Sequence, residues 1–190
     1  MGNLGGCLPD TRVVDEWGTK TSANTHVRLG IPEDYGRATG LPFQAEAKEL
    51  VSIGSSPDGR DLKLTPAAAR AWSVMREAAA SAGIVLVPLS CFRSVERQTA
   101  LIEAKLLKGE LIRDILTTVA APGFSEHHTG NAVDIAVPDA PALTEAFAET
   151  SAFAWLSTHA KAHGFRLSYP KGNPHGFVFE PWHWFFVGQT

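Results

Sequence analysis

The order of hydrophobic and polar positions from residue 46 onward predicts short strands mixed with helices. Leu50–Ile53 and Leu62–Leu64 flank the turn-forming segment Ser55–Gly59, which predicts two strands joined by a turn. Thr65–Pro66 is a helix start, with a threonine N-cap before a proline at the first helical position. We expect this helix to end at Gly83 and to have one hydrophobic face made of Ala69, Trp72, Val74, Met75 and Ala79.

The rest of the chain continues this mixture. Ile84–Phe92 is a continuous apolar run, which is typical of a buried strand. We expect further helices from Ser94 to about Lys108, over Glu110–Val119 and within Ala142–His163, and further strands at Ala132–Val137, Phe165–Tyr169 and within Phe177–Val187. The pattern predicts an α+β domain over residues 46–190, with a mostly antiparallel central sheet flanked by helices.

Residues 1–45 differ from this domain. They are polar and glycine-containing with little periodicity, so we expect an N-terminal arm or an irregular lead-in packed on the domain. A basic segment followed by a hydrophobic one, the pattern of a signal peptide, is not visible there.

Composition narrows the function classes. A chain of 190 residues with 44% hydrophobic residues suits one globular domain. The net charge of −3 argues against general nucleic-acid binding, and no apolar run is long enough to span a membrane. Two cysteines, Cys7 and Cys91, are too few for a disulfide framework or a thiolate zinc site. We expect Cys91, within an apolar run, to be a buried small hydrophobic residue.

The candidate chemistry lies in two segments. In the first, His127 and Asp134 are separated by a glycine-containing turn that leads into a strand, so both side chains can face one cation. In the second, His183 follows the carboxylate Glu180 by three residues on an apolar strand. Two histidines and one carboxylate with an open position form a catalytic-zinc ligand set, and Glu180 is left free to act as a base. His128 is an alternative to its neighbour His127 as a ligand.

These segments resemble the VanY-type zinc D-alanyl-D-alanine carboxypeptidases, in the group of peptidoglycan peptidases that includes VanX dipeptidases and some phage endolysins. The matching residues are Ser125-x-His127-x-x-Gly130-x-Ala132-x-Asp134, Glu180-x-Trp182-His183 and Ser90-Cys91-Phe92-Arg93-Ser94-x-x-x-Gln98. Phe92 stands where the family commonly has tyrosine, and Cys91 where it has a small residue. The resemblance spans about residues 46–187.

The resemblance implies a single zinc peptidase domain with one Zn²⁺ per chain, held by His127, Asp134 and His183. It implies that Glu180 is the general base and later the general acid. Arg93 then stabilises the oxyanion or grips the terminal carboxylate of the substrate. Three further residues are candidates for hydrogen bonds to the substrate: Ser125, Ser94 and Gln98.

The expected activity is hydrolysis of the terminal D-Ala-D-Ala bond of peptidoglycan stem peptides or muropeptides by a monomer in the cell envelope or periplasm. An L,D-carboxypeptidase, a D-Ala-D-Ala dipeptidase, an endolysin-like endopeptidase and a non-catalytic zinc-bearing binding module stay as alternatives. We expect His159 and His163 to be surface residues, and Glu126 and Asp139 to be solvated loop acids.

Overall fold

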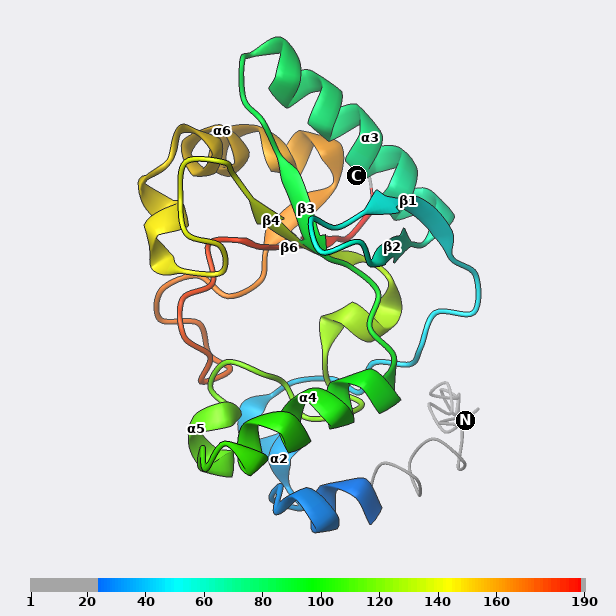
Figure 1. The fold of residues 1–190 in the computed structure, drawn as a ribbon, viewed down its shortest axis with the longest axis vertical. Coiled ribbons are helices and arrows are strands. Elements are labelled where there is room, and N and C mark those ends of the chain that lie inside the picture. Colours follow the sequence, from blue (N-terminus) through cyan, green and yellow to red (C-terminus); the bar gives the residue numbers. More distant parts are fainter. Residues whose placement is uncertain (1–23, 189–190) are drawn as a thin grey trace, which may run out of the picture.

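The computed structural model describes residues 24–188 (Figure 1). The beginning of the expected N-terminal arm, with Cys7, lies outside these residues. Residues 24–29 are helical, and the helices and strands that follow are α2 (Tyr35–Thr39), β1 (Val51–Ser55), β2 (Asp61–Leu64), α3 (Pro66–Ser81), β3 (Val87–Ser90), α4 (Val95–Leu107), α5 (Ile112–Ile115), β4 (Ala132–Ala136), α6 (Ser151–His159), β5 (Phe165–Leu167) and β6 (His183–Phe186). Three 3-10 helices, η1 (Glu126–Thr129), η2 (Glu145–Glu149) and η3 (Ala160–His163), complete the fold.

The expected α+β class is confirmed. Strands β1 and β2 form an antiparallel hairpin, and a second sheet has the strand order β3-β4-β6-β5 with antiparallel pairing throughout. In Figure 1, α3 and α6 lie on the upper side of the sheets, and α2, α4 and α5 lie below them. β4 is buried along its whole length and has a neighbouring strand on each side.

The hydrophobic interior is divided between these two parts. One core cluster packs α3, α6 and the sheet around Trp72, Met75 and Leu156. The other packs α4 and α5 against residues 24–45 and contains Leu29, Ile31, Tyr35, Leu41, Ile102 and Ile115. Residues 29–41 therefore contribute buried side chains to the lower part of the molecule.

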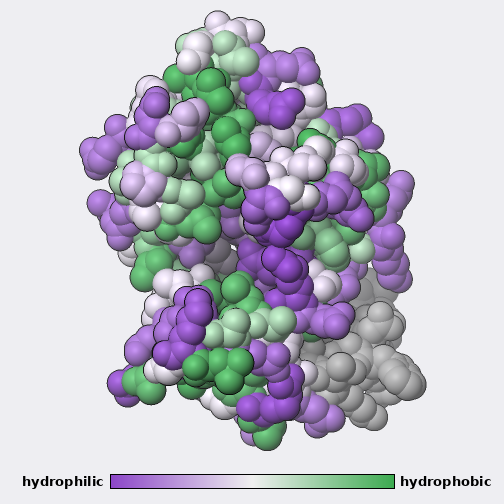
Figure 2. Space-filling model, viewed as in Figure 1, coloured by the Kyte–Doolittle hydropathy of each residue, from purple (hydrophilic) through white to green (hydrophobic). Residues whose placement is uncertain are grey.

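The surface reflects the same division. Figure 2 shows hydrophobic residues on both sides of the waist between the sheet-bearing part and the α4–α5 part.

Within the described part of the chain, no helix combines the length and the hydrophobicity needed to cross a membrane.

The α3 region follows the expectation closely, with one exception. Thr65 caps the helix by accepting a hydrogen bond from the Ala68 backbone N–H, and Pro66 is its first residue. Trp72, Met75 and Ala79 are buried, but Val74 is 54% exposed, because the helix turns it away from the core.

Other elements are shorter than the pattern predicts. The Ile84–Phe92 strand is reduced to β3, an edge strand that is only partly buried, since it has one neighbouring strand. The helix expected over Glu110–Val119 is only α5, and the hydroxyls of Thr117 and Thr118 bond to backbone carbonyls just after it. The strand expected within Phe177–Val187 is only β6, because Pro181 interrupts the pairing before it.

Candidate active site

Strand register brings together the residues at the centre of the site. β4 pairs with β6 so that Asp134 lies opposite His183, and β3 pairs with β4 so that Ser90 lies opposite Asp134 on the other side. Residues directly opposite in an antiparallel pair have neighbouring side chains. Asp134 Oδ1 and His183 Nδ1 are accordingly 2.9 Å apart, although 48 residues separate them along the chain.

His127 enters the site from the turn before β4. It lies in η1, where Ser125 is the N-cap and Gly130 ends the element with φ +67°. A Cβ at Gly130 would lie 2.8 Å from Leu50 Cδ2, so both conformation and packing require glycine there. The Nδ1–H of His127 donates to the Cys91 carbonyl at 2.6 Å, which leaves Nε2 directed at Asp134 Oδ2, 3.2 Å away.

The ligating atoms of His127, Asp134 and His183 all lie within 4.8 Å of one another. A neutral His127 presents the lone pair of Nε2 to the Asp134 carboxylate, and two lone pairs at 3.2 Å repel unless a proton or a cation lies between them. All three side chains are nearly inaccessible to solvent. The donor set therefore fits a small divalent cation of the kind that imidazole and carboxylate ligands select.

His128 is held in a different way from His127. Its Nε2 accepts a hydrogen bond from the Gly123 backbone N–H at 3.1 Å, and its Nδ1–H donates to the Arg93 carbonyl at 2.6 Å. Burial lowers the pKa of His128 to about 4, so the ring is neutral. Both ring nitrogens are occupied by the backbone, which removes His128 as an alternative ligand in this conformation.

Two glutamates, Glu180 and Glu126, line the same cavity as His183, and they differ in their surroundings. The Glu180 side chain is buried, and within the described part of the chain it has no hydrogen-bond partner. Burial raises the pKa of Glu180 to about 7, and the neighbouring Asp134 carboxylate adds to this effect. A carboxylate that gains and loses a proton near neutral pH is suited to general acid–base work.

The second glutamate is Glu126, and the expectation that it is a solvated loop acid is wrong. Its oxygens accept hydrogen bonds from Ser168 Oγ at 2.5 Å, Arg166 Nη2 at 2.7 Å and His183 Nε2 at 2.9 Å. Burial raises its pKa, but these donors outweigh burial and hold the pKa below its ordinary value. The sequence contains one signal for this contact, since Arg166 and Ser168 are two residues apart and share one face of the chain as it leaves β5.

His183 lies between two anions, Glu126 on Nε2 and Asp134 on Nδ1. Burial lowers its pKa, but the two carboxylates outweigh burial and raise the pKa to about 10. Charge attraction and hydrogen bonds from His127 and His183 hold the pKa of Asp134 well below its ordinary range, against the effect of burial. A second carboxylate on the far nitrogen of a metal-ligating histidine is a common arrangement that fixes which nitrogen faces the metal.

Arg93 is fixed at the edge of this cluster. Its guanidinium donates to Gln98 Oε1 at 2.9 Å and to Ser90 Oγ at 3.0 Å, and Nη2 lies 3.9 Å from Asp134 Oδ2. Gln98 is itself anchored by a bond from Nε2 to the Ala120 carbonyl at 2.7 Å. Gln98 is thus engaged in orienting Arg93.

The two serines cap local structure. Ser94 accepts from the Arg97 N–H at the start of α4, and Ser125 accepts from the His127 N–H. Ser125 and Gln98 line the cavity above the cluster, whereas Ser94 does not, so its predicted contact with substrate stays a prediction.

A cavity of about 400 Å³ opens beside the cluster. His127, Asp134, His183, Glu180 and Arg93 all line it. Apolar and aromatic walls complete it, contributed by Leu101, Val119, Leu143, Tyr169, Phe177, Val178 and Trp182. The centre thus combines three atoms that could ligate a metal ion, a carboxylate that can exchange a proton and a fixed guanidinium, a combination that is typical of metal-dependent hydrolases.

One protein-family model matches most of the chain. Residues 61–189 match the model of VanY, D-alanyl-D-alanine carboxypeptidase. The chain belongs to this family.

Individual relatives agree with this assignment. YodJ of Bacillus subtilis (strain 168), which carries the name of a carboxypeptidase, is 38% identical over 126 residues, which cover 64% of this chain and 45% of YodJ. The chain thus spans less than half the length of that relative. The structure of the LD-carboxypeptidase LdcB has a TM-score of 0.68 and 33% identity, covering 78% of this chain and 72% of that one. A Zn(II) complex of a variant of the vancomycin-resistance D,D-pentapeptidase VanY has a TM-score of 0.61 and 26% identity, covering 78% and 83%.

Proposed function

We propose that this chain is a zinc-dependent carboxypeptidase that removes the terminal D-alanine from peptidoglycan stem peptides. The observation that carries the proposal is the convergence of three ligand atoms within 4.8 Å beside the buried carboxylate of Glu180, whose pKa is about 7. The similarity to a VanY enzyme in complex with Zn(II) supports the choice of metal.

In the proposed site, His127 Nε2, Asp134 and His183 Nδ1 hold the metal. A bound zinc ion supplies Lewis-acid polarisation of the scissile carbonyl and lowers the pKa of nearby water. Glu180 accepts a proton from the attacking water and later donates it to the leaving amine. Arg93, held by Gln98 and Ser90, places a permanent positive charge beside the carbonyl oxygen, where negative charge develops.

The substrate class and its location are part of the proposal. A peptide of a few residues fits a cavity of about 400 Å³ with apolar walls. Because peptidoglycan lies outside the cytoplasmic membrane, we infer action in the cell envelope by a monomeric domain.

L,D-carboxypeptidase activity is the second candidate. It is favoured by the comparison with LdcB, which has both the higher TM-score and the higher identity of the two structures compared. The two activities differ in the chirality of the residue before the scissile bond, and hence in which stem peptide is shortened.

The deciding experiment is mass spectrometry of defined muropeptides incubated with the protein, before and after chelation and after zinc is restored. Loss of one D-alanine from a pentapeptide, abolished by chelator and restored by zinc, supports D,D-carboxypeptidase activity. Shortening of a tetrapeptide that ends in an L-residue followed by D-alanine assigns L,D activity. Loss of a D-Ala-D-Ala dipeptide assigns a dipeptidase, and cleavage inside the stem assigns an endopeptidase. Unchanged peptides at full zinc occupancy contradict catalysis and favour a zinc-bearing binding module.

A further inference from the structure

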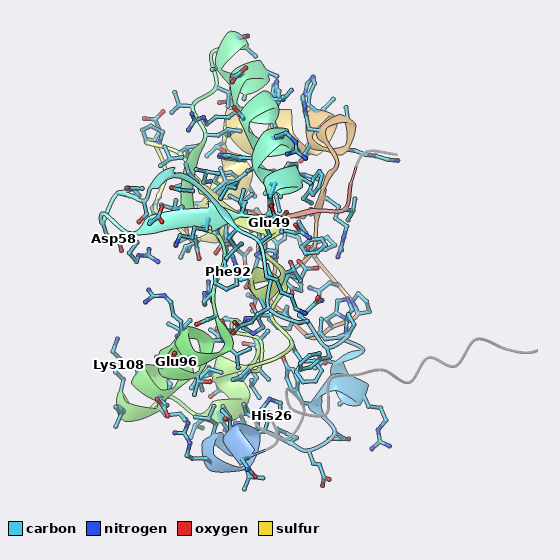
Figure 3. The ribbon with its side chains drawn as sticks, turned by 90° about the vertical axis from the view of Figure 1, so that its right-hand side faces the viewer. His26, Glu49, Asp58, Phe92, Glu96 and Lys108 are labelled. Atoms are coloured by element: carbon cyan, nitrogen blue, oxygen red, sulfur yellow. The ribbon has the colours of Figure 1, made fainter. Side chains whose placement is uncertain are left out.

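A second cavity, of about 540 Å³, continues the cleft beyond the candidate active site. It shares four lining residues with the active-site cavity, namely Arg93, Leu101, Asp134 and Leu143. The two cavities therefore meet at the Arg93–Asp134 edge and form two arms of one cleft. The β1–β2 turn and the start of α4 line this second arm. In Figure 3 the turn carrying Asp58 and the first turn of α4 carrying Glu96 project on the same side of the molecule.

Positive charge distinguishes this second arm. Three arginines line it: Arg60 from the hairpin, Arg93 from the segment before α4, and Arg97 from the first turn of α4. Two carboxylates line the same arm, Asp58 and Asp134, so the arm has an excess of one positive charge.

The arginines are not equally occupied. Arg60 donates through Nε to Asp58 at 2.7 Å and through Nη2 to the Leu89 carbonyl at 3.3 Å. These bonds fix the Arg60 guanidinium, and the Asp58 carboxylate neutralises its charge. Hydrogen bonds from Arg60 and Ser56 lower the pKa of Asp58 to about 2, so this carboxylate is ionised. Arg97, by contrast, makes no side-chain hydrogen bond or ion pair to any residue in the described part of the chain.

The active-site arm of the cleft has no comparable arginine without a partner among its described lining residues. Its cationic side chain away from the cluster is Lys105, which is paired with Glu110 at 3.0 Å. The walls there are mainly apolar and aromatic, with Tyr169 stacked on Phe177 at a centroid distance of 4.6 Å. One arm thus suits methyl groups and aliphatic stems, whereas the other suits an anion.

We propose that Arg97, assisted by Arg60, forms a subsite that binds a carboxylate of the peptide substrate. The inference rests on the proposed peptidase function, because the cavity opens directly onto the candidate active site. Guanidinium groups recognise carboxylates through paired, charge-assisted hydrogen bonds. Two carboxylates of a stem peptide have the required chemistry, the one at its C-terminus and the one on its γ-linked D-glutamyl residue.

Binding measurements with three peptides test the subsite without turnover. The first is a stem pentapeptide with both carboxylates free, the second has the glutamyl carboxylate as a carboxamide, and the third has the C-terminus as a carboxamide. Their dissociation constants are measured by calorimetry on zinc-loaded Glu180→Gln protein, with and without Arg97→Gln or Arg60→Gln. Arg113→Gln is the matched control, because Arg113 lies on α5 and lines neither arm.

We expect Arg97→Gln to weaken binding of the first peptide about 10-fold, the loss of roughly one charge-assisted hydrogen bond, and the Arg113→Gln control to have no effect. If the glutamyl carboxylate is bound, the second peptide binds more weakly than the first, and Arg97→Gln removes that difference. If the terminal carboxylate is bound, Arg97→Gln removes the difference between the first and third peptides instead.

The subsite proposal is wrong if Arg97→Gln weakens the binding of all three peptides equally, or if it weakens the binding of none of them. Cleavage of the peptides is measured separately, so that the two proposals can fail independently. If binding depends on Arg97 but the unmodified protein does not hydrolyse the peptide, the proposed activity is wrong and the subsite stands. If the peptide is hydrolysed and the Arg97 and Arg60 substitutions change nothing, the activity stands and the subsite is wrong.

Discussion

Glu126 and Glu180 are the same residue type with nearly the same exposure, 6% and 7%, yet they have opposite properties. Glu126 accepts hydrogen bonds from a serine, an arginine and a histidine, and its pKa lies below the ordinary value. Glu180 has no such donors within the described part of the chain, and its pKa is raised to about 7. Burial penalises the charged form of both, so the neighbours decide the outcome.

The difference assigns the two carboxylates different tasks. Glu126 is a permanent anion that holds Nε2 of His183 and thereby directs Nδ1 toward Asp134. Glu180 faces the cavity and exchanges its proton near neutral pH. Two carboxylates whose surroundings move their pKa values apart are a recurrent arrangement in acid–base enzymes.

The largest expected effect concerns turnover. Replacing Glu180 with glutamine removes the proposed base, so kcat should fall by about 10²- to 10⁴-fold. Zinc content should stay at one ion per chain, because Glu180 is not among the three proposed ligands. Steady-state kinetics on a cleaved muropeptide, with metal analysis of the same samples, measures both quantities. Near-normal turnover of the Glu180→Gln protein would contradict the assignment.

The next effect concerns the metal. Glu126→Gln removes the anion that orients His183, and zinc affinity should fall by roughly 10- to 100-fold. Competition with a chromophoric chelator measures this affinity directly. Glu180→Gln is the matched control, with the same chemical change at similar burial and no expected loss of affinity. Equal zinc affinities for the two variants would remove the distinction between the carboxylates.

Much of the fold could be predicted from the sequence, because local signals and tertiary structure agree there. Thr65 and Pro66 begin α3 where expected, and Ser94 begins α4. The signals fail where tertiary contacts decide. An apolar run such as Ile84–Phe92 does not reveal that only β3 forms, at a sheet edge, and the periodicity of Glu110–Val119 does not reveal that α5 ends after one turn.

The candidate site could likewise be predicted only in part from the sequence. The spacing of His127, Asp134 and His183 points to a shared cation, and the structure brings their ligating atoms together. The task of Glu126 was missed, because its partners Arg166 and Ser168 are about 40 residues away in the sequence and come close only when β5 joins the sheet. The hydrogen bonds between the His128 ring and backbone groups also form only in the folded loop, so the sequence does not reveal them.

A third prediction concerns stability in the metal-free protein. The pKa of Glu180 in the folded state, about 7, lies above its ordinary value of 4.5. The stability that this group contributes is therefore fully present below pH 4.5 and is lost as the pH rises toward 7. Glu126 has the opposite sign, because its lowered pKa contributes stability above its ordinary value, which is lost as the pH falls.

Denaturant unfolding with a chelator present, at pH 5 and pH 8, measures this difference. At pH 8 we expect Glu180→Gln to be more stable than the unmodified protein by on the order of 3 kcal/mol, and to show little difference at pH 5. Glu126→Gln should be less stable at pH 8 by about 2 kcal/mol, because the charged hydrogen bonds are lost. A change of the same sign in both variants would show that burial alone, and not the neighbours, determines the behaviour of these carboxylates.

The smallest expected effect separates the partners of Glu126. The Arg166 side chain is 49% exposed, so water screens its ion pair with Glu126, whereas Ser168 is buried and donates at 2.5 Å. Arg166→Gln should therefore lower zinc affinity less than about five-fold, since exposed ion pairs contribute under about 1 kcal/mol. Ser168→Ala, measured by the same chelator competition, should lower the affinity more, because it leaves one oxygen of a buried carboxylate without its short hydrogen bond. The reverse order would mean that Glu126 is kept ionised by the charge of Arg166, and that the contrast with Glu180 depends on one surface arginine instead of the buried donors.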